Sequence, residues 1–85
     1  MKDITIKGRE FAIEFEWASQ GFRLMAMEWN GSEWETIPNY DGRTLMLGYT
    51  HFEALCLLSS DLFDEAVYGE DFATALEIPI EWSEN

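Results

Sequence analysis

This chain has few residues that could act as a nucleophile or as metal ligands, and their spacing favours neither role. His51 is the only histidine and Cys56 the only cysteine. Five residues apart on a helix, the two side chains point to different faces, so a cysteine–histidine nucleophile pair is not expected. One cysteine and one histidine also cannot supply a zinc site. We interpret His51 as a surface residue of a first helical turn and Cys56 as a small core residue.

Acidic residues are plentiful, but their pattern indicates neither a metal site nor acid–base catalysis. The stretch Asp61-x-x-Asp64-Glu65 lacks the glycine and the alternating oxygen ligands of a calcium loop. Acid–base catalysis needs a carboxylate desolvated in a cleft, and the sequence indicates no cleft. A glycine-rich phosphate loop is absent, as are basic residues interleaved with aromatics. We therefore expect a non-enzymatic protein without a metal or cofactor.

The charge distribution is the feature that points to a partner. The net charge is −12, and all five Lys and Arg residues lie within residues 1–43. Residues 44–85 hold nine Asp or Glu residues and no Lys or Arg. Such a field repels nucleic acid and anionic membranes, and it attracts basic surfaces such as those of nucleic-acid-binding proteins. The candidate partner-binding residues are Asp61, Asp64, Glu65, Glu70, Asp71, Glu77 and Glu81.

Part of this acidity has a plainer explanation. Asp61, Asp64 and Glu65 could occupy a first helical turn, where the helix dipole favours carboxylates. Glu53 follows Thr50 at the spacing of a capping box, which predicts the start of a helix. Helix starts do not explain the remaining acidic residues. Solubility alone stays open as an explanation for them.

A second candidate surface comes from strand patterning. Apolar residues alternate with polar ones from Glu10 to Thr36, which predicts antiparallel strands with one buried face. The residues expected on that buried face are Phe11, Ile13, Phe15, Trp17, Phe22, Leu24 and Ala26. The opposite face is mixed, with Glu14, Glu16 and Arg23 beside large apolar side chains. An alternative partner-binding patch is formed there by Met25, Met27, Trp29 and Trp34.

Turn residues set the expected register of the sheet. Gly8-Arg9 suggests a two-residue turn that pairs Ile6 with Phe11. Asn30-Gly31 predicts a type I′ turn that pairs Trp29 with Ser32. Pro38 is expected to end the third long strand, since proline donates no ladder hydrogen bond. Residues 43–49 are then expected to form a further strand.

After Thr50 the period becomes helical. Gly69 is expected to stop a helix, and residues 76–82 alternate again as an edge strand that contains Pro79. The sequence thus predicts an α+β fold: an antiparallel meander of four to five strands, one to three short helices packed on one face, and a C-terminal edge strand.

Length and composition predict one cytoplasmic domain spanning residues 1–85. In size and acidity the chain resembles the small inhibitors carried by phages and mobile elements, including anti-CRISPR and anti-restriction proteins. The resemblance implies a DNA-mimicking inhibitor that blocks a basic nucleic-acid-binding site on a larger protein, and it transfers no site residues. The alternative is a structural or adaptor domain that binds a protein through the Met/Trp face or an edge strand. The oligomeric state is left open.

Overall fold

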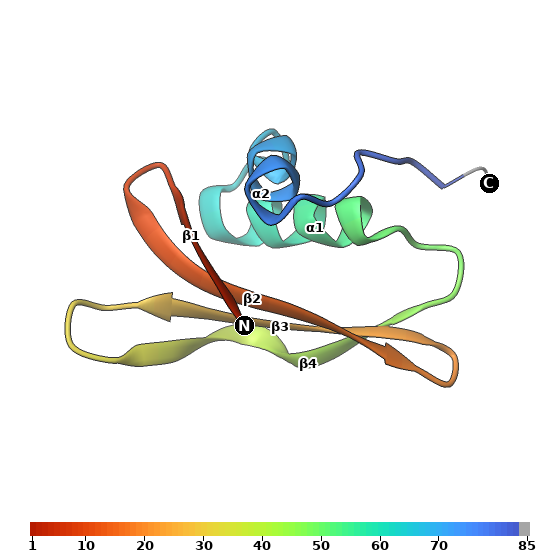
Figure 1. Ribbon diagram of the computed structural model, residues 1–85, viewed down its shortest axis with the longest axis horizontal. Coiled ribbons are helices and arrows are strands. Elements are labelled where there is room, and N and C mark those ends of the chain that lie inside the picture. Colours follow the sequence, from red (N-terminus) through yellow and green to blue (C-terminus); the bar gives the residue numbers. More distant parts are fainter. Residues whose placement is uncertain (84–85) are drawn as a thin grey trace. The chain divides into compact units, whose positions relative to one another are not determined.

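Strand alternation in the first half of the chain gives way to helical periodicity in the second, and the elements follow that change (Figure 1). The computed structural model describes residues 1–83. A four-stranded antiparallel sheet and two helices give an α+β fold, with strand order β1-β2-β3-β4. The elements are β1 (Lys2–Ile6), β2 (Arg9–Ala18), β3 (Gly21–Trp29), β4 (Trp34–Met46), α1 (His51–Phe63) and α2 (Gly69–Leu76).

Two compact units divide these elements between them. The first, Met1–Leu47, contains the whole sheet, and the second begins at Gly48 and contains both helices.

One face of the sheet carries the apolar residues that alternation predicts. Phe15 pairs with Leu24 and Trp17 with Phe22 across β2 and β3, which confirms that these side chains share a face. The buried residues of this face in the first three strands are Ile4, Ile6, Phe11, Ile13, Phe22, Leu24 and Ala26. Trp17, near the end of β2, departs from the pattern because 74% of its surface is exposed.

The first hairpin turns one residue earlier than expected. Lys7 and Gly8 form the turn, with φ angles of 52° and 78°, and Ile6 pairs with Arg9. The expected pair of Ile6 and Phe11 is therefore wrong, and Ile4 pairs with Phe11 instead. Since the register differs by two residues, every side chain keeps its predicted face.

The Asn30-Gly31 turn is also longer than predicted. Trp29 pairs with Trp34 rather than with Ser32, which leaves a four-residue loop. The Asn30 side chain explains the longer loop, because its Oδ1 accepts hydrogen bonds from the backbone amides of Ser32 (2.8 Å) and Glu33 (2.9 Å). An Asx turn of this kind competes with the two-residue turn.

β4 runs through the proline that was expected to end it. The strand continues past Pro38, with register irregularities on either side of Met25 in its pairing with β3. Asn39 and Gly42 take positive φ angles of 71° and 80° there, and Tyr40 is buried. β4 lies at an edge of the sheet, where bulges and proline are tolerated.

The first helix of the second unit begins where the sequence predicts, whereas the second helix begins at the glycine that was expected to stop a helix. The capping box is confirmed: Thr50 Oγ1 accepts from the Glu53 amide at 3.0 Å, and the Glu53 carboxylate accepts from the Thr50 amide at 2.9 Å. α1 ends at Phe63, and Asp64 takes a left-handed conformation with φ 57°. Gly69 begins α2 and does not stop a helix.

The predicted C-terminal edge strand is not found. Residues 78–83 follow α2 without forming a strand within the described part of the chain. Ile80 and Trp82, which alternation placed on an inner face, are 48% and 66% exposed. A short alternating run beside Pro79 is therefore insufficient to make a strand here.

Candidate partner-binding surfaces

Three of the predicted carboxylates cluster where α1 ends. Asp61 lies in the last turn of α1, Asp64 is its C-terminal cap and Glu65 follows directly, and all three are exposed. The expectation that they occupy a first helical turn is wrong. They lie at the negative end of the helix dipole, which disfavours carboxylates, and the last turn of α1 holds no basic residue.

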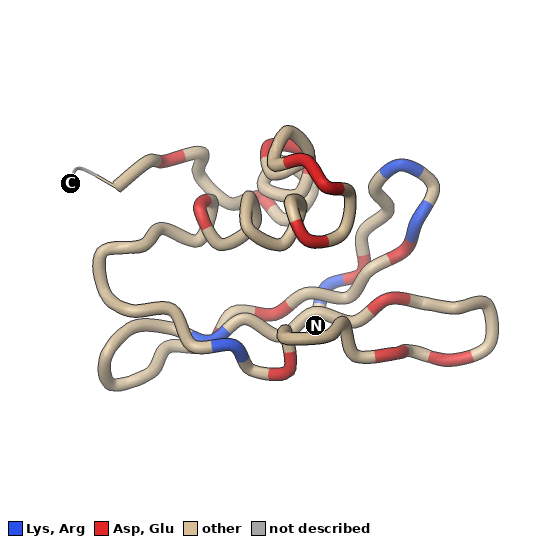
Figure 2. The backbone as a smooth tube through the Cα atoms, turned by 180° about the vertical axis from the view of Figure 1, so that it is seen from behind, with Lys and Arg blue, Asp and Glu red and all other residues tan. Residues whose placement is uncertain are grey.

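The other four predicted carboxylates follow the second helix and the segment after it. Glu70 and Asp71 lie in the first turn of α2, where the dipole favours them. Glu77 is the left-handed C-terminal cap of α2, and Glu81 lies beyond it. All four are exposed. The tube in Figure 2 shows acidic positions along both helices and their connections, whereas every basic position lies in the first unit.

The Met/Trp face is formed as the alternation predicts. Register places Met25, Met27, Trp29 and Trp34 on one face of β3 and β4. The Trp29 and Trp34 rings meet edge to face with centroids 5.4 Å apart, and Trp29 is 37% exposed. Met25 and Met27 are half-buried. The patch is therefore accessible, but its residues shield one another.

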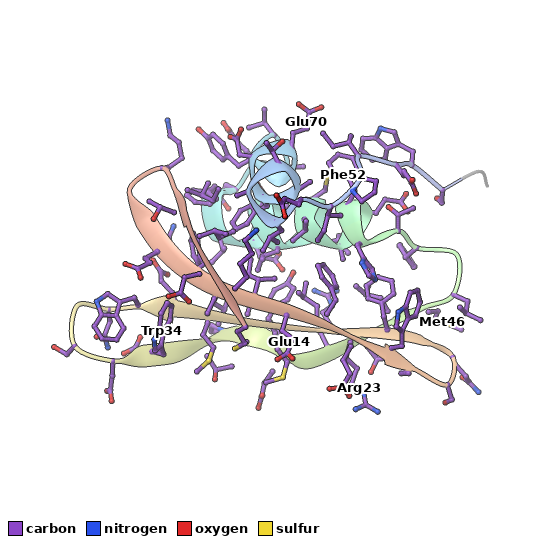
Figure 3. The ribbon with its side chains drawn as sticks, in the orientation of Figure 1. Glu14, Arg23, Trp34, Met46, Phe52 and Glu70 are labelled. Carbon is purple, nitrogen blue, oxygen red and sulfur yellow. The ribbon has the colours of Figure 1, made fainter. Side chains whose placement is uncertain are left out.

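Charged side chains share this face of the sheet. Glu14 pairs with Met25, and Glu16 pairs with Arg23 across the same two strands. The Glu14 and Arg23 side chains point to the same side of the sheet (Figure 3). Arg23 donates to Glu16 Oε1 at 3.1 Å in an exposed ion pair. The face is thus a mixed polar and apolar surface with charges of both signs.

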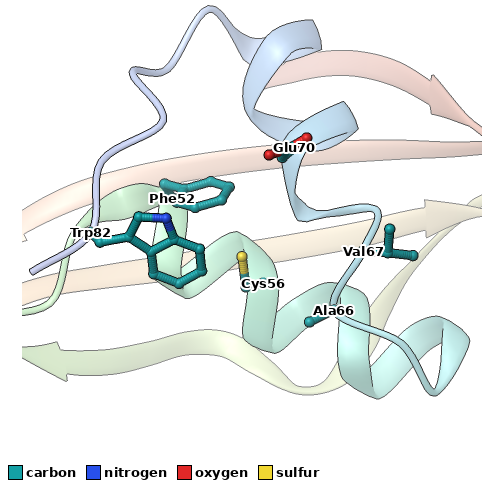
Figure 4. A pocket seen from close by; sticks show the side chains of 6 residues that line it. All are labelled: Phe52, Cys56, Ala66, Val67, Glu70 and Trp82. Atoms are coloured by element: carbon teal, nitrogen blue, oxygen red, sulfur yellow. The ribbon is translucent and has the colours of Figure 1, made fainter.

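The second unit contains a groove that the sequence did not reveal. Its first part has a volume of about 300 Å³ and is surrounded by the labelled side chains of Figure 4. These are Phe52, Cys56, Ala66, Val67, Glu70 and Trp82. Its second part, of about 320 Å³, shares three of these residues and extends along α1 past Glu53. We call the two parts together the Trp82 groove.

The C-terminal segment forms one wall of the Trp82 groove. Thr50 donates through its hydroxyl to the Glu81 carbonyl oxygen at 2.7 Å, and the Ser83 hydroxyl donates to Glu53 Oε2 at 2.9 Å. Between these two bonds the Trp82 ring meets Phe52 edge to face, with centroids 4.8 Å apart. These contacts hold the exposed indole at the start of α1.

Cys56 lies in the Trp82 groove between two acidic side chains, Glu53 and Glu70. Cys56, expected to be a small core residue, is half-buried and lines both parts of the groove. Burial raises the pKa of its thiol, and the carboxylates of Glu53 and Glu70 raise it further. The Thr50 amide, by contrast, lowers the pKa of Glu53 through its hydrogen bond. A thiol in such surroundings stays protonated and is a poor nucleophile.

The sequence contains little signal for this groove. The capping box fixes Glu53 at the start of α1, but nothing in the local pattern shows that Trp82 returns to Phe52. His51, the first residue of α1, is half-buried, and burial lowers the pKa of its imidazole. Within residues 1–83, no group of three or more His, Cys, Asp or Glu side chains is arranged to hold a metal ion.

Comparison with known proteins adds no further constraint. No protein-family model matches the chain, and no curated protein and no solved structure is significantly similar to it. In the described part of the chain, neither helix has the length and apolar character needed to cross a membrane.

Proposed function

We propose that this protein is a non-enzymatic binding protein whose second unit blocks a basic nucleic-acid-binding site on a larger protein. The observation that carries the proposal is the exposure of all seven predicted carboxylates in a stretch, residues 44–85, without any Lys or Arg. Carboxylates presented in this way offer a basic site the same charge that nucleic-acid phosphates offer.

The positions of the carboxylates support binding over solubility as their role. Asp61, Asp64 and Glu77 lie at helix C-termini, where the dipole opposes them, and neither last turn holds a basic residue. Acidic residues elsewhere on the surface would provide the same solubility without the unfavourable interaction with the helix dipole. Repulsion among like charges lowers the stability of the free protein, and a basic partner would relieve it.

Affinity capture from a lysate of the source cell tests the proposal, with parallel elution by salt and by duplex DNA. We expect a nucleic-acid-binding protein that either eluent releases. A variant with Asp64→Asn, Glu65→Gln, Glu70→Gln and Asp71→Asn should bind this partner about tenfold more weakly and with a smaller dependence on salt. Equal affinity and equal salt dependence in this variant would rule the proposal out.

The second candidate function is an adaptor domain that binds through the Met/Trp face, and the accessible Trp29–Trp34 pair favours it. Binding of this kind depends little on salt. Trp34→Ala is the discriminating variant: it should abolish capture if the Met/Trp face binds the partner, and should leave capture unchanged if the carboxylates do.

A further inference from the structure

The Trp82 groove combines an apolar lining with carboxylates on two sides. Its two parts share Cys56, Ala66 and Trp82, and the first part includes Glu70 whereas the second includes Glu53. Both carboxylates act electrostatically on the thiol between them. The ligand that complements such a groove has an apolar stem and a positive charge at its end.

The carboxylates of Glu53 and Glu70 differ in their hydrogen bonding and exposure. Glu53 accepts hydrogen bonds from the Thr50 amide and the Ser83 hydroxyl, so its oxygens already serve the structure of the unit. Glu70 is exposed in the first turn of α2 and lines the first part of the groove (Figure 4). Glu70 is therefore the carboxylate positioned to pair with an incoming cation.

The size and the aromatic wall of the groove narrow the choice of cation. The first part of the groove, which includes Glu70, has a volume of about 300 Å³; this lies at the low end of ligand pockets and suits a single side chain better than a cofactor. The Trp82 indole is 66% exposed and offers its ring system to a planar partner. A guanidinium group stacks on an indole and pairs with a carboxylate, whereas an ammonium group is more strongly hydrated and does not stack.

We propose that the Trp82 groove binds an arginine side chain of the partner protein, with its aliphatic stem against Cys56 and Ala66 and its guanidinium group between Trp82 and Glu70. The inference rests on the proposed function and deepens it, because it names where a basic surface inserts one residue. The exposed carboxylates attract the partner at long range, and insertion of the arginine into the groove fixes where the partner binds.

An NMR titration with N-acetyl-arginine amide tests the groove without requiring the partner. The readout is the indole N–H signal of Trp82, with the signals of Trp29 and Trp34 as references. We expect a saturable shift at Trp82 alone, and no such shift with N-acetyl-citrulline amide, which has nearly the same shape without the charge. An equal response to citrulline, or a response confined to the reference tryptophans, would overturn the inference.

Matched variants separate the groove from the general acidic field. Glu70→Gln should weaken arginine binding about two- to fivefold, whereas the adjacent Asp71→Asn, which removes the same charge outside the groove lining, should change it less than twofold. Equal losses in the two variants would reject the groove and leave the proposed function standing.

A second pair of variants tests occupancy of the groove directly. Val67 is 63% exposed in the groove wall, so its replacement should leave the fold intact. Val67→Lys should abolish the shift because its own cation competes for Glu70, and Val67→Gln should retain it. If arginine binds as expected but capture yields no nucleic-acid-binding protein, the proposed function fails while the groove stands.

Discussion

Gly69 lies against Cys56 so closely that no larger residue fits between α1 and α2. A Cβ atom added to Gly69 would lie 2.6 Å from Cys56 Sγ and 3.0 Å from its Cα. The same cysteine lines the Trp82 groove. The start of α2 therefore packs closely against α1 beside the groove.

Gly69→Ala should reduce the free energy of unfolding by about 1–3 kcal/mol, because the added methyl group overpacks the contact. The loss should occur even though alanine favours helix over glycine by about 1 kcal/mol. Urea unfolding followed by circular dichroism measures it. Adding Cys56→Ala should recover part of the loss, since Sγ is removed while Cα remains. A Gly69→Ala protein as stable as the wild type would contradict this packing.

The salt bridge of Arg9 with Glu28 should contribute more than that of Arg23 with Glu16. Arg9 donates through both Nε (2.7 Å) and Nη2 (2.8 Å) to the two Glu28 oxygens, whereas Arg23 makes one bond of 3.1 Å. The Arg9 pair raises the pKa of Arg9 and lowers the pKa of Glu28, mainly through these hydrogen bonds. Glu28 also lies opposite Glu35 in the register of β3 and β4.

Arg9→Ala should therefore cost about 1 kcal/mol and Arg23→Ala only a few tenths of that, as measured by chemical denaturation at low salt. The difference has a second cause, since removing Arg9 leaves Glu28 opposite a like charge. Arg9→Ala combined with Glu28→Gln should be less harmful than Arg9→Ala alone. Equal losses for the two arginine variants would show that the bidentate geometry contributes nothing.

The faces of the strands could be predicted from the sequence, but their exact partners could not. Period-two alternation fixes which face a side chain takes, and a register error of two residues leaves that face unchanged. The Lys7-Gly8 turn illustrates this, because Ile4 and Ile6 remain buried despite the different pairing. The Asn30 loop and the bulges of β4 depend on side-chain-to-backbone bonds and positive φ angles, which alternation does not report.

Some of the candidate sites could be predicted from the sequence, whereas the Trp82 groove could not. The carboxylates and the Met/Trp face follow from composition and alternation; the structure shows the carboxylates exposed, whereas in the Met/Trp face Trp29 is exposed and its neighbours are half-buried. The Trp82 groove depends on Trp82 reaching Phe52, a contact between residues 30 apart that only tertiary structure brings together. Because glycine weakens helices in general, the sequence predicts a helix stop at Gly69, whereas in the structure its missing side chain permits close packing at the start of α2.

Lys7→Asn should stabilise the first hairpin. Lys7 and Gly8 both have positive φ, the conformation of a type I′ turn, in which asparagine is preferred before glycine. We expect a gain of about 0.5–1 kcal/mol, since a left-handed conformation costs lysine more than asparagine. The melting temperature gives the measurement. Lys7→Gln is the matched control, because it removes the same charge without tolerating positive φ, and a similar gain in both variants would point to charge instead.

The stability of the second unit should depend on the ionisation of Glu53. The Thr50 amide lowers the pKa of this carboxyl, opposed by partial burial and assisted by the Ser83 hydroxyl. Because the folded protein favours the ionised form, the stabilisation is complete above the unfolded pKa of about 4.3 and is lost as the pH falls through the lower folded pKa. The free energy of unfolding of the wild type should thus decline between about pH 5 and pH 3.

Glu53→Gln isolates this contribution, because the amide side chain can accept the Thr50 hydrogen bond but does not titrate. Urea unfolding at several pH values should show the wild type losing its advantage over Glu53→Gln as the pH falls, whereas Glu10→Gln, an exposed change on β2, should follow the wild-type curve. A gap between wild type and Glu53→Gln that stays constant with pH would mean that the carboxylate charge does not contribute to the cap. The hydrogen-bond geometry alone would then hold the start of α1, and with it the segment that carries Trp82.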